Sequence, residues 1–451
     1  MLGIGGIGMS ALARYFHAMG MQVAGYDKTE TTLTQELISE NIAVQYDDDV
    51  KELPAFLSND NHESLLVIYT PAMPSDLKLL NYLKLQQTLY KRSQVLGMIA
   101  ANTSTVAVAG THGKTTTSCM VTHLLKTKGI QCSAFLGGIS KNYNTNFIAG
   151  SFNQTPHTVV VEADEFDRSF LTLFPKYAII TSTDADHLDI YNTADELLKS
   201  YNQFASQVAP DGKLVCRLGL KVNVPNMITY AINEPADARG YNIRIENHEY
   251  VFDYSYNGNN INNIRSGMPG RHNVENVVAA ITIALLHGAG VDEIKQGVSS
   301  FTGVKRRFDY QIKSKDVVYI DDYAHHPSEI EAAIKSSKEL YPGMHTTVIF
   351  QPHLYSRTRD FADGFASSLS LANKTILLPI YPARELPIAN VNSEMIKNKM
   401  TGECELCEKS DLLEMLTSSK TALVMTLGAG DIDTFVAPVR QLLNKKINAH
   451  Q

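Results

Sequence analysis

The chain has 451 residues, of which 44% are hydrophobic, and it carries a formal net charge of −7 with a pI near 6.1. This length predicts about three domains with full cores, and the acidic balance argues against nucleic acid as a bulk partner. No apolar run reaches the about 18 residues of a membrane span. We therefore expect no membrane span. Because no Lys or Arg precedes the apolar stretch at the N-terminus, we expect no signal peptide either.

The first glycine motif, at residues 3–8, reads Gly-Ile-Gly-Gly-Ile-Gly and fits the pattern G-x-G-x-x-G. A helix is expected from about Gly8 to Met19, and a strand from Gln22 to Tyr26. Asp27 follows that strand, 19 residues after Gly8, where a Rossmann fold places the carboxylate that holds a ribose. On these residues alone, an NAD-binding domain is a serious interpretation.

The motif itself requires only a pyrophosphate near a helix N-terminus, and a UDP-sugar supplies one as well as NAD does. Only Met1 and Leu2 precede the glycines, so the first strand of such a fold should be nearly missing. A further strand is expected from Leu65 to Tyr69. Beyond it, Thr70 and Arg92 are candidates for the same ligand, with a solvated turn and surface charge as the alternative. The candidate residues for this ligand are Gly5, Gly6, Ile7, Gly8, Asp27, Thr70 and Arg92.

A second glycine-rich turn, at residues 110–115, reads Gly-Thr-His-Gly-Lys-Thr. The apolar run from Val106 to Ala109 before it predicts a strand buried on both faces, and a helical pattern from Thr116 to about Lys128 follows. Strand, glycine turn and helix N-terminus together are typical of a phosphate-binding loop. Val108 stands where the usual pattern has its first Gly, so the loop is shorter than usual.

In such a loop, Lys114 would reach the outer phosphates and the Thr115 hydroxyl would hold Mg²⁺. The alternative is an ordinary turn that happens to contain Gly-Lys-Thr. The candidate nucleotide-binding residues are Gly110, Thr111, His112, Gly113, Lys114, Thr115 and Thr116.

Two later strands of the same domain, ending near Val161 and Thr183, are each followed by acidic residues. Open α/β sheets bind ligands at the carboxyl ends of their strands, and Mg²⁺ prefers oxygen ligands. Glu162 is therefore our candidate metal ligand after the first strand, with a solvated acidic loop as the alternative. After the second strand, ligand chemistry favours Asp184 or Asp186 over His187, but composition does not decide between them.

Residues 211–266 alternate short β-like segments with Asn and Gly, which predicts an antiparallel β segment inserted in the central domain. An Ala-rich helix then begins near Asn273. Asn273 and Asn276 lie three residues apart on one helical face, where they could hydrogen-bond an adenine edge. Helix capping is the alternative for Asn273.

In the last third of the chain, four strand candidates end near residues 320, 350, 380 and 426, and polar side chains follow each of them. Together these endings predict one ligand-binding edge of a small α/β sheet. Guanidinium groups at such an edge suit a carboxylate or a migrating phosphate. The candidates are Arg307, Asp322, His325, His353 and Arg357.

The five cysteines are scattered and odd in number, which predicts reduced thiols in a reducing compartment. Cys404 and Cys407 form a lone C-x-x-C. Because no second pair and no nearby His accompanies them, we interpret them as incidental thiols rather than zinc ligands.

These segments together resemble the Mur ligases over nearly the full length of the chain. The matching motifs are Gly-Ile-Gly-Gly-Ile-Gly-Met-Ser, Gly-Thr-His-Gly-Lys-Thr-Thr-Thr, Glu-Ala-Asp-Glu, Asp-His-Leu-Asp, Gly-Arg-His-Asn, Val-Lys-Arg-Arg-Phe, Asp-Asp-Tyr-Ala-His-His-Pro, Phe-Gln-Pro-His, Tyr-Pro-Ala-Arg-Glu and Gly-Ala-Gly-Asp. The resemblance implies an α/β protein with a Rossmann-like UDP-binding domain (1–103), a central P-loop ATPase domain with the inserted antiparallel segment (104–303) and a Rossmann-like C-terminal domain (304–451). The last domain would contact the amino acid and ATP.

The resemblance also implies an ATP-dependent ligase of peptidoglycan precursor synthesis in the cytoplasm. Such an enzyme would join L-alanine to the carboxylate of UDP-N-acetylmuramate through an acyl phosphate. Its implied partners are these small molecules, with no nucleic acid and no membrane, and the chain would be a monomer or a weak homodimer. The alternatives are another Mur-type ligase, an NAD-linked oxidoreductase built on residues 3–27, or a non-catalytic nucleotide switch built on residues 110–115.

For individual residues, the resemblance implies Mg²⁺ held by Thr115, Glu162 and His187, which would decide for His187. No carbamylated lysine is expected, so Lys199 is left out of the site. Leu354 stands where many family members carry Arg. The implied catalytic residues are Lys114, His325, His353 and Arg357, and the further implied ATP contacts are Asn273, Asn276, Arg307 and Asp322.

Overall fold

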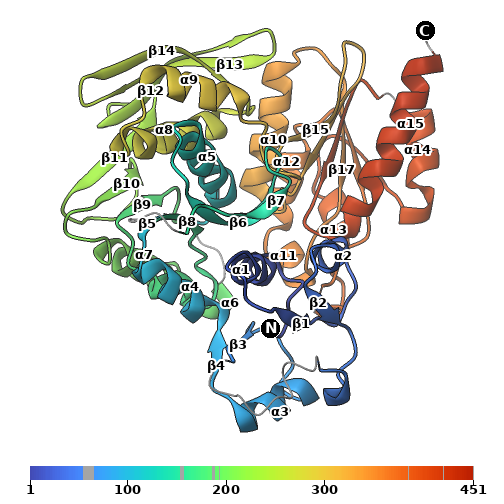
Figure 1. The fold of residues 1–451 in the computed structure, drawn as a ribbon. Coiled ribbons are helices and arrows are strands. Elements are labelled where there is room, and N and C mark those ends of the chain that lie inside the picture. The colour runs from blue at the N-terminus through green and yellow to red at the C-terminus, as the bar shows by residue number, and fades with distance from the viewer. Residues whose placement is uncertain are drawn as a thin grey trace. The chain divides into compact units, whose positions relative to one another are not determined.

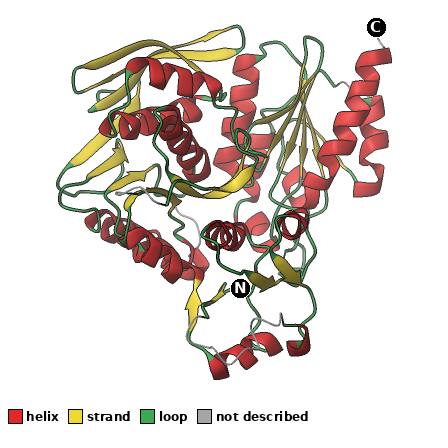
Figure 2. Cartoon of the chain, viewed as in Figure 1, coloured by secondary structure: helices red, strands yellow, loops and turns green. Residues whose placement is uncertain are grey.

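The computed structural model describes residues 1–53, 65–152, 157–184, 188–191, 193–383, 385–419 and 421–449 (Figure 1). Helices and strands alternate along most of this chain (Figure 2), so the expected α/β class is confirmed. The chain divides into two compact units. The first unit comprises Met1–Asn242, Phe252–Ile264 and Glu275–Phe301, and the second comprises Ile243–Val251, Arg265–Val274 and Thr302–Gln451.

The first hundred residues form a small parallel α/β layer. Strand β1 (Ala24–Tyr26) pairs with β2 (Ala43–Gln45), and β3 (Val67–Tyr69) pairs with β4 (Leu89–Lys91), all in parallel. Leu2 makes parallel bridges to both Tyr26 and Tyr69. A single residue therefore stands where a first strand would lie, as we predicted from the two residues before the glycine motif. The helices of this part are α1 (Ile7–Ala18), α2 (Thr32–Ser39), α3 (Lys78–Gln86) and α4 (Arg92–Ala101).

The main sheet of the first unit has ten strands in the order β14-β13-β12-β11-β10-β9-β5-β8-β6-β7. At its centre, β5 (Ser104–Ala109) lies parallel between β8 and β9, and residues 105–109 are fully buried. This burial is the one expected for an apolar strand covered on both faces. The remaining strands are β6 (Ser133–Ser140), β7 (Thr145–Ile148), β8 (Thr158–Glu162), β9 (Tyr177–Ile180), β10 (Lys213–Arg217), β11 (Met227–Ile232), β12 (Ala238–Glu246), β13 (Glu249–Tyr256) and β14 (Asn259–Ser266).

The antiparallel segment of this sheet begins later than we predicted from residue 211. Strands β10 and β11 continue the parallel sheet beside β9, and only β12, β13 and β14 are joined by two-residue turns. Those turns, Asn247-His248 and Asn257-Gly258, have positive φ at both positions, which is typical of hairpins between antiparallel strands. In β10 three buried apolar residues, Leu214, Val215 and Cys216, follow one another. This pattern is typical of a strand covered on both faces, so the predicted start at residue 211 was wrong.

Helices flank this sheet, and α5 (Lys114–Thr127) is buried along most of its length. Helix α1 packs on β6 and β7, where the ring of Tyr15 meets the rings of Phe135 and Phe147. The other helices here are η4 (Phe166–Thr172), α6 (Leu188–Tyr191), α7 (Ala194–Ser206), α8 (Arg271–Leu286) and α9 (Val291–Ser300).

The second unit is built on a six-stranded sheet in the order β15-β16-β20-β17-β18-β19. Only β15 runs antiparallel to its neighbour. The register aligns Asp322 with Leu427, Leu427 with Phe350, and Phe350 with Leu377. Four strands therefore end at one edge, as predicted. The strands are β15 (Asp309–Lys313), β16 (Val318–Asp322), β17 (Thr346–Phe350), β18 (Lys374–Leu377), β19 (Glu403–Leu406) and β20 (Leu423–Leu427).

The helices of the second unit are α10 (Pro327–Leu340), α11 (Tyr355–Asp360), α12 (Ala362–Leu369), α13 (Glu394–Lys397), α14 (Leu412–Ser418) and α15 (Val436–Ala449). The His-His-Pro motif starts α10, with His326 as the N-cap and Pro327 in the first turn, because proline is pre-set for that position. In the described part of the chain, no helix combines the length and apolar character needed to cross a bilayer.

Candidate active site

The turn between β5 and α5 has the geometry that its glycines predicted. Gly110 and Gly113 have φ of 133° and 82°, which is backbone that favours glycine. A Cβ on Gly110 would lie 2.1 Å from Thr181 Oγ1, and one on Gly113 would lie 2.8 Å from Asn276 Oδ1. Helix α5 begins at Lys114, two residues earlier than expected, with Gly113 as its N-cap. The N-terminal N–H groups of α5 therefore face the turn without a capping side chain, as an anion site requires.

The carboxyl end of β9 holds the middle of this turn. The Thr111 N–H donates to the Ser182 carbonyl (3.3 Å), and the His112 N–H donates to Ser182 Oγ (2.8 Å). Thr111 Oγ1 also donates to the carbonyl of Asp184 (2.8 Å). These bonds fix the turn to a neighbouring strand of the sheet.

Lys114 reaches back across the turn. Its Nζ donates to the Gly110 carbonyl (2.7 Å) and to both carboxylate oxygens of Glu165, at 2.9 and 2.7 Å. Burial alone would lower the pKa of Lys114, but the charges of Glu165, Asp164 and Glu162 outweigh it and raise that pKa. The side chain is therefore a permanent cation at the phosphate-binding turn.

Thr115 and Glu162 form an oxygen-donor pair beside Lys114. Thr115 Oγ1 donates to Glu162 Oε1 (3.0 Å), and Glu162 Oε2 accepts the N–H of Gly137 (2.9 Å). A Cβ on Gly137 would lie 2.2 Å from Glu162, so glycine is needed where β6 passes this carboxylate. Burial raises the pKa of Glu162, and Lys114 acts against that rise.

This pair fits the expected Mg²⁺ site, because a hydroxyl and a carboxylate are hard oxygen ligands that leave room for phosphate oxygens. Asp186 and His187 lie outside the described residues, so the choice between them stays a prediction. Among the residues that the structure describes, no group of three or more His, Cys, Asp or Glu side chains is placed to hold a metal ion.

The first glycine motif lies at the start of α1, with its predicted partners around it. The Gly5 N–H donates to Asp27 Oδ2 (2.8 Å). A Cβ on Gly8 would lie 2.8 Å from Arg92 Nη1, and one on Gly3 would lie 2.4 Å from Thr70 Cγ2. The structure therefore brings the side chains of Asp27, Arg92 and Thr70 together at this glycine motif.

The two glycine motifs are linked through the acidic end of β8. Arg92 Nη2 lies 3.8 Å from Asp164 Oδ2. Asp164 stands two residues beyond Glu162 of the oxygen-donor pair. The guanidinium therefore faces both the start of α1 and the Glu-Ala-Asp-Glu motif.

Sequence reasoning missed a buried polar contact between α1 and β7. Asn146 is fully buried, and its Nδ2 donates to the Ile7 carbonyl (2.5 Å) and to Ser10 Oγ (2.9 Å). Arg14 donates to Asn146 Oδ1 and makes three further hydrogen bonds to the carboxylate of Glu40. We predicted no role for Asn146 from the sequence. The apolar residues that follow Asn146 were the available signal for a strand.

In the second unit, Asp322 ties together two loops at the carboxyl edge of the sheet. Its carboxylate accepts the N–H groups of Phe308 and Ala324, both at 2.8 Å. Burial raises the pKa of Asp322 to about 6, although the charge of Arg307 and these two bonds act against the rise. Arg307 lies with its guanidinium 5.1 Å from the ring centre of Tyr323.

Three predicted residues of the second unit come together at the same edge. The rings of His325 and His353 are 6.2 Å apart, and the ring of Tyr381 stacks on His353 at 5.8 Å. Arg357 is near enough for its charge to lower the pKa of both imidazoles. His353 Nδ1 is buried and has no hydrogen-bond partner among the described residues, so it is available to a ligand.

An unusual turn presents His353 and Arg357. Leu354 has φ 71° and ψ 137°, a conformation that is costly for any residue except glycine. Its N–H donates to the Tyr381 carbonyl (2.9 Å), and the Glu385 carboxylate accepts the Ser356 N–H (2.9 Å) at the start of α11. Tyr381 and Glu385 therefore hold this turn. The predicted Arg384 of the Tyr-Pro-Ala-Arg-Glu motif lies outside the described residues.

Asn273 and Asn276 occupy the first turns of α8. Asn273 is buried, and its Nδ2 donates to the Pro269 carbonyl (2.6 Å). Because α8 begins at Arg271, Asn273 lies within the first turn and not at the capping position that we kept as an alternative. Asn276 is buried against Gly113 of the phosphate-binding turn. An adenine contact of either residue stays a prediction.

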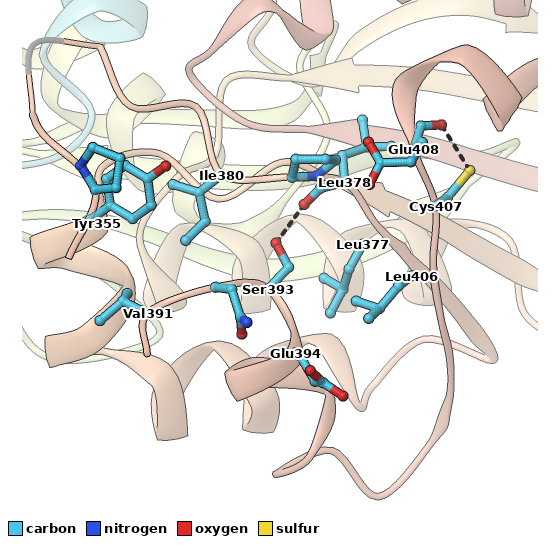
Figure 3. A pocket seen from close by; sticks show the side chains of 13 residues that line it. Tyr355, Leu377, Leu378, Ile380, Val391, Ser393, Glu394, Leu406, Cys407 and Glu408 are labelled. Carbon is cyan, nitrogen blue, oxygen red and sulfur yellow. Dashed lines mark hydrogen bonds between the residues drawn. The ribbon is translucent and has the colours of Figure 1, made fainter. Parts of the chain in front are cut away.

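A pocket of about 360 Å³ lies in the second unit, at the ends of β18 and β19 (Figure 3). Its walls are mainly apolar and include Leu377, Ile380 and Val391, while the Cys407 thiol inside it donates to the Glu408 carbonyl (3.2 Å). Tyr355 is the lining residue nearest in sequence to the predicted site. None of the predicted site residues lines this pocket.

The His353 imidazole should stay neutral through the physiological range. Burial is the main cause, and it lowers the pKa of His353 to about 4, with His325 and Arg357 adding to the effect. The pKa of His in an unfolded chain is about 6.5, so the unfolded chain takes up a proton before the folded protein does. The contribution of His353 to the free energy of unfolding is therefore complete above that pH and is lost as the pH falls toward 4.

This value can be measured by following the imidazole nitrogens in NMR spectra between pH 3.5 and 8. The His353 signals are assigned by their absence from a His353→Gln variant. A titration midpoint of 6 or higher would contradict the expectation.

Comparison with known proteins agrees with this geometry. Three family models match in succession: Mur ligase family, catalytic domain, at residues 1–104; Mur ligase middle domain at residues 108–284; and Mur ligase, glutamate ligase domain, at residues 306–432. These matches cover most of the chain.

Individual relatives give the same result over the whole length. The chain is 48% identical to the UDP-N-acetylmuramate–L-alanine ligase of Christiangramia forsetii, covering 98% of this chain and 96% of that protein. It is 47% identical to the ligase of the same name from Flavobacterium johnsoniae, covering 99% and 98%. The crystal structure of the UDP-N-acetylmuramate-alanine ligase of Thermotoga maritima superimposes with a TM-score of 0.82 at 26% identity, covering 100% and 99% of the two chains. The resemblance seen in the motifs is confirmed, and the chain belongs to the Mur ligase family.

Proposed function

We propose that this protein joins L-alanine to the carboxylate of UDP-N-acetylmuramate at the expense of ATP. The products would be UDP-N-acetylmuramoyl-L-alanine, ADP and phosphate, in peptidoglycan precursor synthesis. The observation that carries the proposal is the turn between β5 and α5, where Lys114 and the Thr115–Glu162 pair meet at a helix N-terminus. The names of the full-length relatives support the choice of substrates.

A carboxylate does not condense with an amine in water, so ATP must activate it. The γ-phosphoryl group would pass to the muramate carboxylate, forming an acyl phosphate and ADP. The alanine amine would then attack the acyl carbon, and phosphate would leave from a tetrahedral intermediate. Phosphoryl transfer depends mainly on positioning and charge stabilisation.

Different residues of the chain would bind the nucleotide, the metal ion and the UDP portion of the substrate. The N–H groups of the turn and Lys114 would hold the phosphates, and Thr115 and Glu162 would hold Mg²⁺, which neutralises phosphate charge when bound. The start of α1 with Asp27 and Arg92 would hold the UDP portion. Aligning reactants can supply about 7–11 kcal/mol, against about 2.7–4 kcal/mol for one charge-stabilising donor, so alignment should contribute most.

The second unit would bind the incoming amino acid. Arg357 offers a fork of donors for the alanine carboxylate, and the neutral imidazole of His353 can accept a proton from the attacking amine. We further propose that residues 1–103, 104–303 and 304–451 act as the UDP, ATP and amino-acid domains.

Phosphate release tests the proposed function most directly. The purified protein is given ATP, Mg²⁺ and UDP-N-acetylmuramate, and each amino acid is added in turn. We expect release of ADP and phosphate in step with one new amide, with alanine as the best substrate. Phosphate release without a new amide, or with an amino acid other than alanine strongly preferred, would contradict the proposal.

Replacing His353 and Arg357 together with alanine should impair use of the amino acid. We expect kcat/KM for alanine to fall at least about tenfold, because a hydrogen bond to a charged group contributes about 1.5–3 kcal/mol. The dissociation constant for ADP should change little. Unchanged kcat and KM for alanine would remove these two residues from the site.

A further inference from the structure

The ammonium group of Lys114 is engaged by acceptors of the protein itself. It donates to the Gly110 carbonyl at 2.7 Å and lies between the two carboxylate oxygens of Glu165, at 2.9 and 2.7 Å. The Thr111 carbonyl lies 3.4 Å away. An ammonium has three donors, so these contacts account for its hydrogen-bonding capacity.

Glu165 is held in place from several sides. Its side chain is only 1% exposed, and its carbonyl accepts the Tyr191 hydroxyl at 2.6 Å and the Arg168 N–H at 2.9 Å. Asp167 and Arg168 follow in left-handed backbone, with φ of 52° and 55°. Such backbone persists only where the surrounding structure holds it, so the carboxylate sits on a stiff turn.

A bound phosphate and the Glu165 carboxylate would compete for the same cation. Both are anions, and charges this close interact strongly away from bulk water. Glu165 should therefore weaken nucleotide binding in the ground state. The same contact keeps the ammonium aimed across the turn, and a group that is oriented in advance favours the transition state.

We infer that Glu165 is a positioning residue for phosphoryl transfer, which holds Lys114 over the phosphate-binding turn at the cost of nucleotide affinity. The inference rests on the proposed function and adds a residue to it. Glu165 acts through Lys114 and need not touch the substrate.

The test is the isosteric change Glu165→Gln, measured by ADP titration in a calorimeter and by steady-state ligation. We expect the dissociation constant for ADP to fall and kcat to fall at least about tenfold, which is 1.4 kcal/mol. Affinity and turnover should thus move in opposite directions. Simple damage to the site would weaken both together.

Two further variants of Glu165 and Lys114 sharpen the test. Glu165→Asp keeps the charge on a shorter side chain, so its ADP affinity should stay near that of the wild type while kcat falls. It also serves if Glu165→Gln does not fold. In a Lys114→Met background, Glu165→Gln should lower kcat no further, because residues that act as a unit are not additive.

Glu196→Gln is the matched control, since Glu196 on α7 pairs with Lys199 at 2.6 Å but is 41% exposed. It makes the same carboxylate-to-amide change and should alter neither quantity. The inference fails if the wild type binds ADP and ligates while Glu165→Gln keeps both properties, or loses both together. If the wild type itself forms no amide, the proposed function fails instead.

Discussion

Lys114→Ala should lower the turnover number of ATP-dependent ligation at least about 100-fold, in line with the loss of one charge-stabilising donor in other enzymes. The side chain is the cation that bridges the Gly110 carbonyl and the carboxylate end of β8. Without it, negative charge on the transferring phosphoryl group would face Glu162 and Glu165 uncompensated. The measurement is initial-rate phosphate release at saturating substrates.

The same change should also destabilise the protein, because it removes the ammonium group that pairs with the buried Glu165 carboxylate. Removing one member of a buried ion pair costs about 3–5 kcal/mol. Thermal unfolding is compared between Lys114→Ala and the double variant Lys114→Met/Glu165→Gln, which removes both charges. The comparison separates the loss of stability from the loss of turnover. We expect the double variant to regain stability while remaining inactive.

Lys199→Ala is the control for Lys114→Ala. Lys199 is 72% exposed and pairs only with a neighbour on its own helix in the described structure, so its removal should leave turnover and stability near those of the wild type. Near-normal ligation by a folded Lys114→Ala variant would reject the role that we give to this turn.

Gly110→Ala should abolish measurable nucleotide binding and destabilise the protein by about 2–6 kcal/mol, the sum of an overpacked contact and a strained backbone. Its φ is 133°, and the added Cβ would lie 2.1 Å from Thr181 Oγ1 and 2.8 Å from the Ser182 backbone nitrogen. The backbone of β9 cannot yield without breaking the bonds that hold Thr111 and His112.

Gly129→Ala provides a matched comparison for this prediction. Gly129 has φ of 89°, but nothing lies within 4 Å of its added Cβ. Only the strain of the left-handed backbone should destabilise Gly129→Ala, by about 1–2 kcal/mol, and ADP binding should be retained. Denaturant unfolding and ADP titration of both variants decide the matter. Equal stability of the two would show that the close packing at Gly110 is unimportant.

Regular patterns of strand, turn and helix were enough to predict several parts of the site. The turn at Gly110 follows from an apolar strand, two glycines and a helix start, all adjacent in sequence. The position of Asp27 beside Gly5 follows from the regular length of a helix and a strand. The common edge of β16, β17, β18 and β20 follows because parallel strands share a direction.

Contacts between distant segments were beyond such signals. Glu165 pairs with Lys114 across 51 residues, and Asn146 reaches Ile7 across 139. Their residue types are ordinary for a surface loop, so nothing local marks them as buried partners.

The amino-acid sequence by itself therefore determined the phosphate-binding turn, the glycine motif at α1 and the family. These depend on backbone conformations and periodicities that neighbouring residues set. The tertiary structure alone decided which carboxylate holds Lys114 and which side chains connect α1 to β7. It also decided that Tyr381 and Glu385 hold the turn at Leu354. Packing chooses those partners, because a buried polar group must find its hydrogen bond wherever the fold brings one.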